Sequence, residues 1–486
     1  MLAGLNIFGK SDIENIIDEG IELLKNPGIR VFNENGLKML GQAGAQINLA
    51  DRIASIPRDL VEESLKSVPS EITLYSMENR PVVNYKDDLI HFDPGSTAIA
   101  ILDRKSGKQR APLTNDLIEF IKLVELLPQI DAQSTAMICS DVPEKIADLY
   151  RLYLALNFMQ KPIITGAFRK ETCKVMFDML ITVRGDTQSL KEFPLAVFDV
   201  CPSPPLTWSD LTCQNLIDCA LNWIPVHIVS MPLAGATAPV TLAAAVVQHT
   251  AENLSGLVIN QLANSGAPLV WGGSPSAMDM RYGTTPMGDP GTWLINSAYV
   301  QVGKHLNIPT HVYMGMSDAK TIDAQCGYES MGGMIVATLI GANMISGAGM
   351  LDFESCQSFE KLVLDAELIG YCKRFKAGID IRESPISLDL FDEMRHSSKF
   401  ISHPHTRKWF RDELFFPSDV IDRQKYLSWE NTGSRDAFSR AKQAVDDLLN
   451  SFQGVLLGEE KSSELKKITE SEAIRFGMDR LPEINL

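Results

Sequence analysis

The sequence predicts an α/β fold in which parallel strands close into a (β/α)8 TIM barrel. From about residue 115, short apolar runs alternate with helical patterns at a spacing of roughly 30–40 residues. Each run is continuously apolar, as expected for strands that are buried on both faces. No Gly-x-Gly-x-x-Gly motif follows an early strand, so the barrel is favoured over a doubly wound open sheet.

Seven strands are expected in this region, and Leu89–Phe92 supplies an eighth. The seven are Thr135–Cys139, Pro162–Gly166, Leu195–Cys201, Val226–Met231, Leu269–Gly273, Thr310–Gly315 and Asn343–Gly347. The helices expected between them are Glu144–Phe158, Lys170–Val183, Trp208–Asn222, Pro239–Ser265, Gly291–Leu306 and Tyr328–Ile340.

Residues 1–88 are expected to cap the barrel, which is expected to span residues 89–375. Ser11 and Glu14 form a capping box at the start of an amphipathic helix. Further helices are expected at Asn35–Ala45 and from Pro57, so that residues 1–70 are helical. Alternating runs then predict a small antiparallel β-hairpin region, at Ile72–Ser76, Val82–Tyr85, Leu89–Phe92 and Ala98–Leu102.

Residues 376–486 are expected to form a loop-rich C-terminal helical extension, because the composition turns polar and charged after Phe375. Two exposed amphipathic helices are expected there, at Asp436–Phe452 and Ser462–Arg475.

The net charge of −16 over 486 residues argues against nucleic acid or an anionic membrane surface as a partner. It suits a cationic substrate slightly better than an anionic one. The eight cysteines form no Cys-x-x-Cys pair, and residues 1–20 contain no apolar segment of a secretory signal. Free thiols and a cytoplasmic location are therefore expected.

The stretch Tyr313–Phe353 is expected to form a buried βαβ unit whose charges lie only in its two loops. The 22 residues Ser330–Leu351 carry no charge and are long enough to cross a membrane. Five glycines and Asn343 interrupt this run, which favours a buried core.

Several common chemistries have weak support in the sequence. His249 and Glu252 have a spacing that could ligate a metal, but they lie in the middle of a helix. His227 and His311 lie near strand starts, where buried structural roles are expected, and no histidine directly follows a strand to serve as a base. Gly347–Gly349 could bind phosphate, although no basic residue is adjacent.

Aromatic residues near strand ends give a stronger signal. Such side chains together with carboxylates suit a quaternary ammonium group, through cation–π and charge attraction. Any one of these aromatics could instead pack in the core. The predicted substrate-binding residues are Trp271, Tyr313, Asp318, Tyr328, Glu329, Ser346 and Phe353.

Four segments together resemble the trimethylamine methyltransferase family. They are Ser317–Glu329, Gly341–Leu351, Pro202–Trp208, and the run from Pro232–Ala236 to Ala251–Val258. The resemblance covers about residues 10–375. It implies a (β/α)8 barrel that moves a methyl group from an amine to the cobalt of a separate corrinoid protein.

The founding members of that family carry pyrrolysine, whereas this chain contains only the twenty common residues. It is therefore similar to the pyrrolysine-free branch, whose members demethylate quaternary amines such as glycine betaine, proline betaine and carnitine. A quaternary amine leaves as a neutral tertiary amine, so no catalytic proton-transfer group is predicted. No tightly bound cofactor and no metal are expected, because the partner protein would supply the cobalt corrinoid.

Within this interpretation the aromatics would form a cage, and Asp318 and Glu329 would balance the cation or hold a neighbouring hydrogen bond. Ser346 would reach the polar end of the substrate. Lys320, Arg281 and His311 are candidates for binding the substrate's carboxylate. The corrinoid protein would dock at the barrel mouth, and an apolar surface on the late helices would favour a homo-oligomer. The alternatives are a barrel lyase or isomerase acting on a phosphorylated metabolite, and a non-enzymatic betaine-binding protein.

Overall fold

The computed structural model describes residues 4–484 and contains an eight-stranded parallel barrel. The strand order is β6-β18-β17-β15-β13-β11-β10-β9. The amides of Asp131 and Ala132, next to β9, both donate to the Phe92 carbonyl of β6 and bring the two edges together. The strands are β6 His91–Asp93, β9 Gln133–Ser134, β10 Ile163–Thr165, β11 Ala196–Val200, β13 Val226–Ser230, β15 Leu269–Gly273, β17 Thr310–Tyr313 and β18 Met344–Ser346. The predicted barrel, including its eighth strand from Leu89–Phe92, is confirmed.

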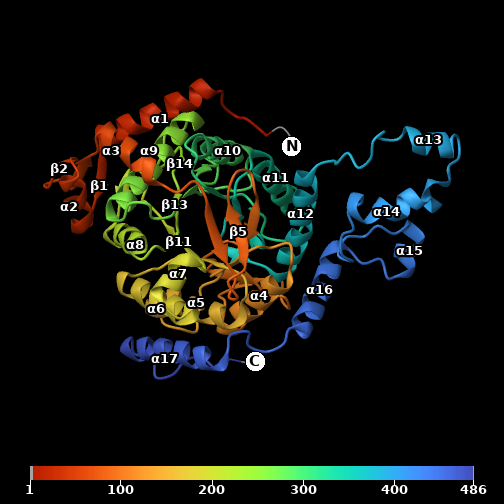
Figure 1. Ribbon diagram of the computed structural model, residues 1–486. Coiled ribbons are helices and arrows are strands. Elements are labelled where there is room, and N and C mark those ends of the chain that lie inside the picture. The colour runs from red at the N-terminus through yellow and green to blue at the C-terminus, as the bar shows by residue number, and fades with distance from the viewer. Residues whose placement is uncertain (1–3, 485–486) are drawn as a thin grey trace.

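A helix follows each strand, and together these helices surround the sheet (Figure 1). Side chains cap several of them, as where Asp323 accepts the amides of Gln325 and Cys326. Gly341 ends its helix with a φ of 71°, which favours glycine. The helices are α4 Thr114–Leu126, α5 Ala147–Phe158, α6 Lys170–Arg184, α8 Asp210–Leu221, α9 Leu242–Ala263, α10 Pro290–His305, α11 Ala324–Ile340 and α12 Phe359–Ala377, with the short α7 Thr187–Glu192 after α6.

The N-terminal cap contains more than the predicted helices. Helices α1 (Lys10–Lys25) and α3 (Arg58–Ser67) pack on α9, and α2 (Glu34–Gln42) packs on α8 and α9. Between them lies a small sheet, to which a short strand from the barrel region adds a parallel partner: β1 Ile29–Val31, β2 Gln46–Asn48, β3 Ile53–Ser55 and β12 Thr207–Trp208. The predicted capping box is also shifted, because α1 starts at Lys10 and the Gly9 amide donates to Asp12.

A β-hairpin closes the amino end of the barrel. Strands β4 (Ile72–Tyr75) and β5 (Pro81–Tyr85) pair antiparallel and lie across the centre of the ring of helices (Figure 1). Their apolar side chains pack against inward-facing residues such as Val197 and Val270. Only these two of the four predicted runs pair with each other. Ala98–Leu102 instead gives a strand of a separate sheet, which comprises β7 Ala100–Leu102, β8 Gln109–Arg110, β19 Met350–Leu351 and β20 Cys356–Gln357.

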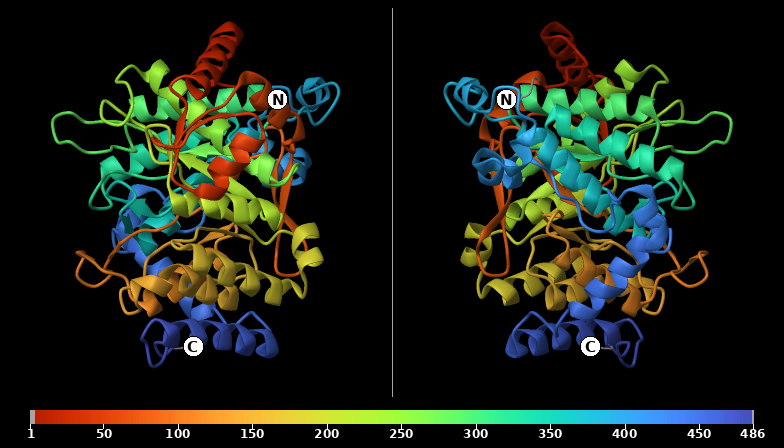
Figure 2. Two further views of the ribbon diagram at one scale, coloured as in Figure 1. Left: turned by 90° about the vertical axis from the view of Figure 1, so that its left-hand side faces the viewer. Right: turned by 90° about the vertical axis from the view of Figure 1, so that its right-hand side faces the viewer.

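Two further two-residue strands, β14 Leu233–Ala234 and β16 Ser276–Ala277, pair with each other after β13 and β15. The C-terminal extension packs on the outside of the barrel and projects from it (Figures 1 and 2). Helix α16 (Ala437–Ser451) contacts α12 and α4, and α17 (Glu459–Arg475) contacts α6 and α5. The projecting part consists of α13 Leu388–Met394, α14 Pro404–Glu413 and α15 Tyr426–Asn431. Within residues 4–484 the helices are too short or too polar to cross a membrane, and the uncharged run forms α11 and β18 instead.

We predict that Tyr85→Phe destabilises the protein by about 1–3 kcal/mol. The Tyr85 hydroxyl bonds the ring of buried His227 at 2.8 Å, and its loss leaves a buried polar nitrogen unpaired. Tyr75→Phe in the same hairpin is the matched control, because Tyr75 is less buried and its hydroxyl forms no hydrogen bond within the described residues. Denaturant unfolding measures both variants. Equal effects of the two changes would contradict the importance of this contact.

Candidate functional site

Polar side chains fill the carboxyl half of the barrel interior. Successive residues of a strand face opposite sides, so His227 and His311 point inward between outward-facing neighbours. Asp93, Asp199 and Ser346 do the same on β6, β11 and β18. These residues follow the apolar layer around Val197 and Val270 that the hairpin covers. The floor of the barrel is therefore apolar and its mouth is polar.

Asp199, His227 and Tyr85 form a buried chain. The Asp199 Oδ1 lies 2.9 Å from His227 Nδ1, and His227 Nε2 lies 2.8 Å from the Tyr85 hydroxyl. A carboxylate accepts the Nδ1 proton, so Nε2 can accept the proton of Tyr85. Burial lowers the pKa of His227 to about 3, and the ring is therefore neutral at physiological pH.

His311 stacks on His227, with ring centroids 4.2 Å apart and planes within 9°. Its Nε2 lies 2.9 Å from the Ser346 hydroxyl, which in turn donates to Asp93. Burial, and then His227, lower the pKa of His311 well below its usual value. A neutral His311 does not provide the cation that the sequence suggested for a substrate carboxylate.

Three carboxylates, Asp93, Asp199 and Glu354, gather around Tyr313, and we refer to them as the carboxylate trio. Burial raises the pKa of Tyr313 well above its usual value, and the charges of all three acids raise it further. Asp93 is fully buried and the Asp199 side chain is 11% exposed. Within residues 4–484, no lysine or arginine forms an ion pair with any of the three.

Burial is the main cause of the raised pKa of each acid in the trio. The pKa rises to about 7 for Asp93, about 6 for Asp199 and about 7 for Glu354. The charge of Asp199 raises the pKa of the other two. Hydrogen bonds work in the opposite direction, from Ser346 and Gly95 to Asp93 and from Ser274 to Glu354. The carboxylate trio is therefore an anionic cluster without a paired cation among the described residues, and burial raises the pKa of each acid towards neutral pH.

The loop that supplies Glu354 has an unusual backbone. Asp352, Phe353 and Glu354 have φ angles of 52°, 56° and 72°, which residues other than glycine seldom adopt. Each such residue costs about 1–2 kcal/mol. Surrounding contacts hold the loop, including the hydrogen bond of 2.6 Å from Ser274 to Glu354. Backbone strain of this kind is concentrated at functional sites.

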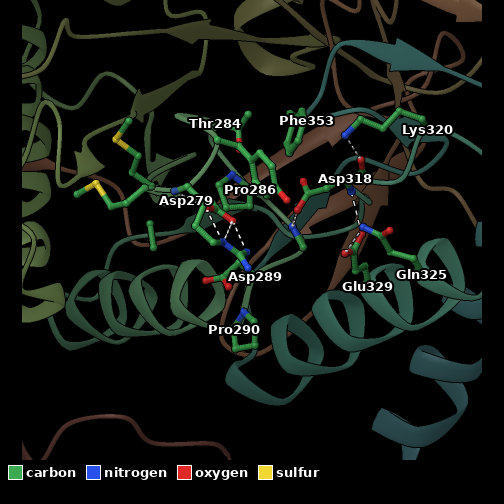
Figure 3. Close-up of a pocket in the computed structure, with 16 residues that line it drawn as sticks. Asp279, Thr284, Pro286, Asp289, Pro290, Asp318, Lys320, Gln325, Glu329 and Phe353 are labelled. Atoms are coloured by element: carbon green, nitrogen blue, oxygen red, sulfur yellow. Dashed lines mark hydrogen bonds and ion pairs between the residues drawn. The ribbon is translucent and has the colours of Figure 1, made fainter.

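A cavity of about 860 Å³ lies beside the mouth (Figure 3). Asp318, Glu329 and Phe353 line it, together with residues 277–290. Asp318 accepts the amides of Met287 and Gly288 at 2.7 and 2.9 Å. Glu329 accepts the Ser317 hydroxyl and the Asp318 amide at 2.7 and 2.9 Å. Both acids thus hold neighbouring loops, which is one of the two roles expected for them. Burial raises the pKa of Asp318 to about 6.

The other cations suggested by the sequence are already engaged near this cavity. Lys320 lies 3.7 Å from the centroid of the Phe353 ring and 3.3 Å from the carboxylate of Asp352. Arg281 is 79% exposed in its side chain and pairs with Asp279 at 2.5 Å. Lys320 therefore occupies one face of the ring that was expected to contribute to the cage.

The structure does not assemble the four predicted aromatics into one cage. Trp271 faces outward between the sheet and the helices, where it packs against Gly303 and His249. It is completely buried there, so it does not line the interior. Tyr328 is 64% exposed on α11 and is not among the residues that line the cavity. Tyr313 and Ser346 lie in the interior, and Phe353 lies at its edge.

The metal and phosphate hypotheses are not supported by the side chains around them. His249 faces the Gly272 carbonyl at 3.1 Å, and Glu252 accepts the Leu206 amide and the Ser230 hydroxyl. In the part of the chain that is described, no group of three metal-binding side chains is found. The amides of Gly347 and Ala348 donate to the Asp93 carbonyl, and the Gly349 amide donates to Asp365. An anion there would meet a carboxylate instead of free amides.

The sequence interpretation missed Glu354, Asp93 and Asp199 as site residues, and it missed the clustering of His227 with His311. A signal was available for all of these residues except Glu354. Asp93, Asp199, His227 and His311 are polar or charged positions in or at the end of otherwise apolar strand runs. A strand residue is only two or three positions from the carboxyl end when strands are this short. A histidine near a strand start therefore still faces the mouth.

The comparisons with known proteins agree with this architecture. A family profile described as trimethylamine methyltransferase (MTTB) matches residues 1–473. The chain belongs to this family. It is 27% identical over 478 residues to a trimethylamine methyltransferase of Desulfitobacterium hafniense, covering 98% of this chain and 96% of that one. It is 28% identical over 431 residues to a glycine betaine methyltransferase of the same species, covering 88% and 89%. The protein is thus an enzyme that transfers methyl groups, and the lyase and non-enzymatic alternatives are excluded.

Among solved structures, the chain is similar to the monomethylamine methyltransferase of Methanosarcina barkeri, with a TM-score of 0.53. The two share 14% sequence identity, and the match covers 90% of this chain and 87% of that chain. At this identity the similarity shows the fold alone, which is the same kind of barrel.

We predict that Glu354→Gln stabilises the protein at pH 8. Glutamine keeps the acceptor for Ser274 and removes a half-buried charge that Asp318 and Asp199 repel. The folded state binds the Glu354 proton more tightly than the unfolded state does. This acid therefore destabilises the folded protein increasingly as pH rises from about 4.5 towards 7.

Thermal unfolding of wild type and variant across pH 4–8 tests this expectation. The gain in melting temperature should be largest above pH 7 and should vanish near pH 4. Exposed Glu144→Gln is the control, with no comparable pH-dependent gain. A gain of Glu354→Gln that is equal at pH 4 and pH 8 would contradict the raised pKa.

Proposed function

We propose that this methyltransferase takes a methyl group from a small quaternary ammonium substrate of the betaine type and passes it to cobalt(I) of a cognate corrinoid protein. The observation that supports the substrate class is the carboxylate trio, which lacks a cation of its own within the described residues. The glycine betaine methyltransferase among the relatives is consistent with this choice.

A permanent cation matches the electrostatics of the mouth. Burial disfavours the ionised forms of all three acids and is the main reason why their pKa values are raised, and the charge of Asp199 raises the pKa of Asp93 and Glu354 further. An ammonium group near them favours ionisation and offsets the repulsion. The Tyr313 ring lies among the three acids and offers a face for cation–π attraction.

The chemistry requires little of the protein beyond positioning. The bond between nitrogen and the methyl carbon breaks, and its electron pair stays on nitrogen as a neutral tertiary amine. The methyl carbon bonds to cobalt through an electron pair of cobalt(I), which becomes cobalt(III). No proton moves in this exchange. The barrel would hold one methyl group in line with the acceptor and exclude water, and alignment of this kind supplies much of an enzyme's rate.

The interior contacts fix the orientation of the groups that would touch the substrate. Asp199 is held by His227, and Asp93 by Ser346 and Gly95. The Ser346 hydroxyl donates its proton to Asp93. We therefore propose that Ser346 positions Asp93, in place of the expected contact with the polar end of the substrate. The mouth of the barrel is where the corrinoid protein would dock, and we also propose that the enzyme is a homo-oligomer.

Methyl transfer itself is tested with the purified enzyme, chemically reduced cob(I)alamin and individual betaines under anaerobic conditions. Formation of methylcobalamin, followed by its absorbance, is the expected result for at least one quaternary amine. Trimethylamine is the comparison substrate. Transfer from trimethylamine alone, with no quaternary amine active, would overturn the proposal.

We predict that Glu354→Gln raises the KM for the active betaine about tenfold, because one unit charge facing the cation is lost. The hydrogen bond from Ser274 can persist in this variant. A KM equal to that of the wild type would mean that Glu354 does not face the ammonium group. Glu144→Gln again controls for a general effect of charge.

Tyr313 offers a separate test of the ring contact. Tyr313→Phe keeps the aromatic face and loses the hydroxyl, whose hydrogen bond to Asp199 is long at 3.3 Å, so a change of less than about threefold in affinity is expected. Tyr313→Leu removes the face and should weaken betaine binding by about 3–30-fold. Calorimetric titration measures both. Equal losses in the two variants would argue against cation–π binding.

A further inference from the structure

We propose that Arg151 binds the carboxylate of the substrate, at the carboxyl ends of strands β6, β9 and β10. The inference rests on the proposed function and narrows it to zwitterionic substrates, in which a quaternary ammonium and a carboxylate are joined by a short linker. It assigns to Arg151 the role that the sequence suggested for Lys320, Arg281 or His311.

Arg151 is a buried cation with few partners. It lies on α5 and is 1% exposed. Its Nη1 donates to the Thr135 carbonyl at 2.8 Å and reaches the Thr97 hydroxyl at 3.4 Å. Its buried Nε has no acceptor among the described residues. Proteins normally pair a buried charge, because an unpaired one is costly.

Among the described residues, no acid forms a direct ion pair with Arg151. Asp148 is the carboxylate that most favours the charged guanidinium, but its oxygens accept from the amides of Phe168 and Leu149 and from the Thr172 hydroxyl. Burial lowers the pKa of Arg151 to about 10, so the side chain stays positive at neutral pH. A ligand carboxylate would supply a directly bonded negative charge and bidentate acceptors.

The contacts of Arg151 place it at the catalytic end of the barrel. Thr97, Thr135 and Phe168 follow strands β6, β9 and β10, so all three lie at carboxyl ends of strands. The guanidinium carbon lies 4.5 Å from the centroid of the Phe168 ring, which supports the group from one side. These three strands are neighbours in the closed barrel.

A line of hydroxyls connects the positive and negative sides of the mouth. The Thr97 hydroxyl, next to Arg151, bonds the Ser96 hydroxyl at 3.3 Å. Hydrogen bonding from Ser96 lowers the pKa of Asp199 and of Tyr313. The hydroxyls of Thr97 and Ser96 thus lie between Arg151 and the side of the mouth that holds Asp199. Thr97 has a φ of 73°, a strained conformation for a β-branched residue.

Arg184 is half-buried, and its Nε also lacks an acceptor among the described residues, but its terminal nitrogens show what a structural role looks like. Burial lowers its pKa to about 10 as well. Its Nη1 donates to the Ser76 carbonyl and the Asn79 side chain at 2.9 and 2.6 Å, and its Nη2 donates to the Tyr75 carbonyl. These acceptors tie α6 to the hairpin at the far end of the barrel. Arg151 has fewer acceptors among the described residues, all of them on Nη1, and this favours an external ligand over a purely structural function.

The experiment compares each betaine with its methyl ester, which keeps the quaternary ammonium and lacks the negative charge. Affinities of glycine betaine, carnitine and their methyl esters are measured by calorimetry for wild type, Arg151→Gln, Arg151→Lys and the control Arg184→Gln. Wild type should bind at least one acid about tenfold or more tighter than its ester. Arg151→Gln should weaken binding of that acid by about 10–100-fold and change ester binding by less than threefold. Arg151→Lys should be intermediate, and Arg184→Gln should leave the ratio of acid to ester unchanged.

Folding of the variants is checked by thermal unfolding. Arg151→Gln should remain folded, because the Thr135 carbonyl also accepts the Thr97 amide at 3.3 Å. A parallel loss of acid and ester binding in Arg151→Gln, or no loss of either, overturns the inference. So does equal binding of acid and ester by the wild type.

Failure of the inference can be told apart from failure of the proposed function. If the esters bind and are demethylated to the same extent as the acids, the methyl-transfer proposal is supported and the role of Arg151 is contradicted. If the acids bind with the expected dependence on Arg151 but give no methylcobalamin, the role of Arg151 is supported and the proposed reaction is contradicted. If neither acids nor esters bind, both are overturned.

Discussion

The burial of Asp93, Asp199 and Glu354 without a paired cation is the constraint on which the rest of the site depends, and the charge of Asp199 adds to it by repelling the other two. Isolated carboxylates would leave such an environment or stay protonated. Here a network of neutral donors holds each one: Ser346 and Gly95 for Asp93, His227 for Asp199, and Ser274 for Glu354. The donors limit the cost of burial without cancelling the charge, and this leaves an attraction for a cation from outside.

Support for this network extends to both ends of the barrel. The hairpin closes the amino end and sends Tyr85 to His227, so a residue outside the barrel strands fixes the ring that orients Asp199. At the other end, the strained turn Asp352–Glu354 directs Glu354 over the mouth. The loop of residues 277–290 is held by Asp318 and, through Asp318 and Ser317, by Glu329. Precise placement of charge suits a reaction that depends on alignment and not on proton transfer.

The mouth also has an uneven distribution of charge. Acids lie near β6, β11 and β18, whereas the unpaired Arg151 lies over β6, β9 and β10. A zwitterion could satisfy both sides at once, which neither a simple amine nor an anion could do. The wider cavity beside Asp318 and Phe353 lies next to this region and is lined by ion pairs that are already complete.

The order of strands and helices was predictable because continuous apolar runs and capping residues are local signals. Seven of the eight strands overlap the ranges predicted from the sequence, and most helices of the barrel were also located. The exception is β9, which lies at Gln133–Ser134, just before its predicted range of Thr135–Cys139. The N-terminal sheet was missed, because its three-residue strands are too short for a clear alternating pattern. Of the site residues, Tyr313 and Ser346 were placed in the interior correctly, since they end strands. Trp271 was misplaced, because which face a residue takes depends on the strand register, and a shift of one residue reverses it.

The sequence by itself therefore determined the fold class, the family, and the residues available at strand ends. Only the tertiary structure decided which of these residues meet. Glu354 comes within range of Asp318 and Asp199 through a turn with three positive φ angles, and Arg151 reaches the mouth from a helix. Both depend on contacts between segments far apart in the chain. Charge pairing and burial, which set the pKa values of these groups, are properties of that spatial arrangement and leave no local pattern in the sequence.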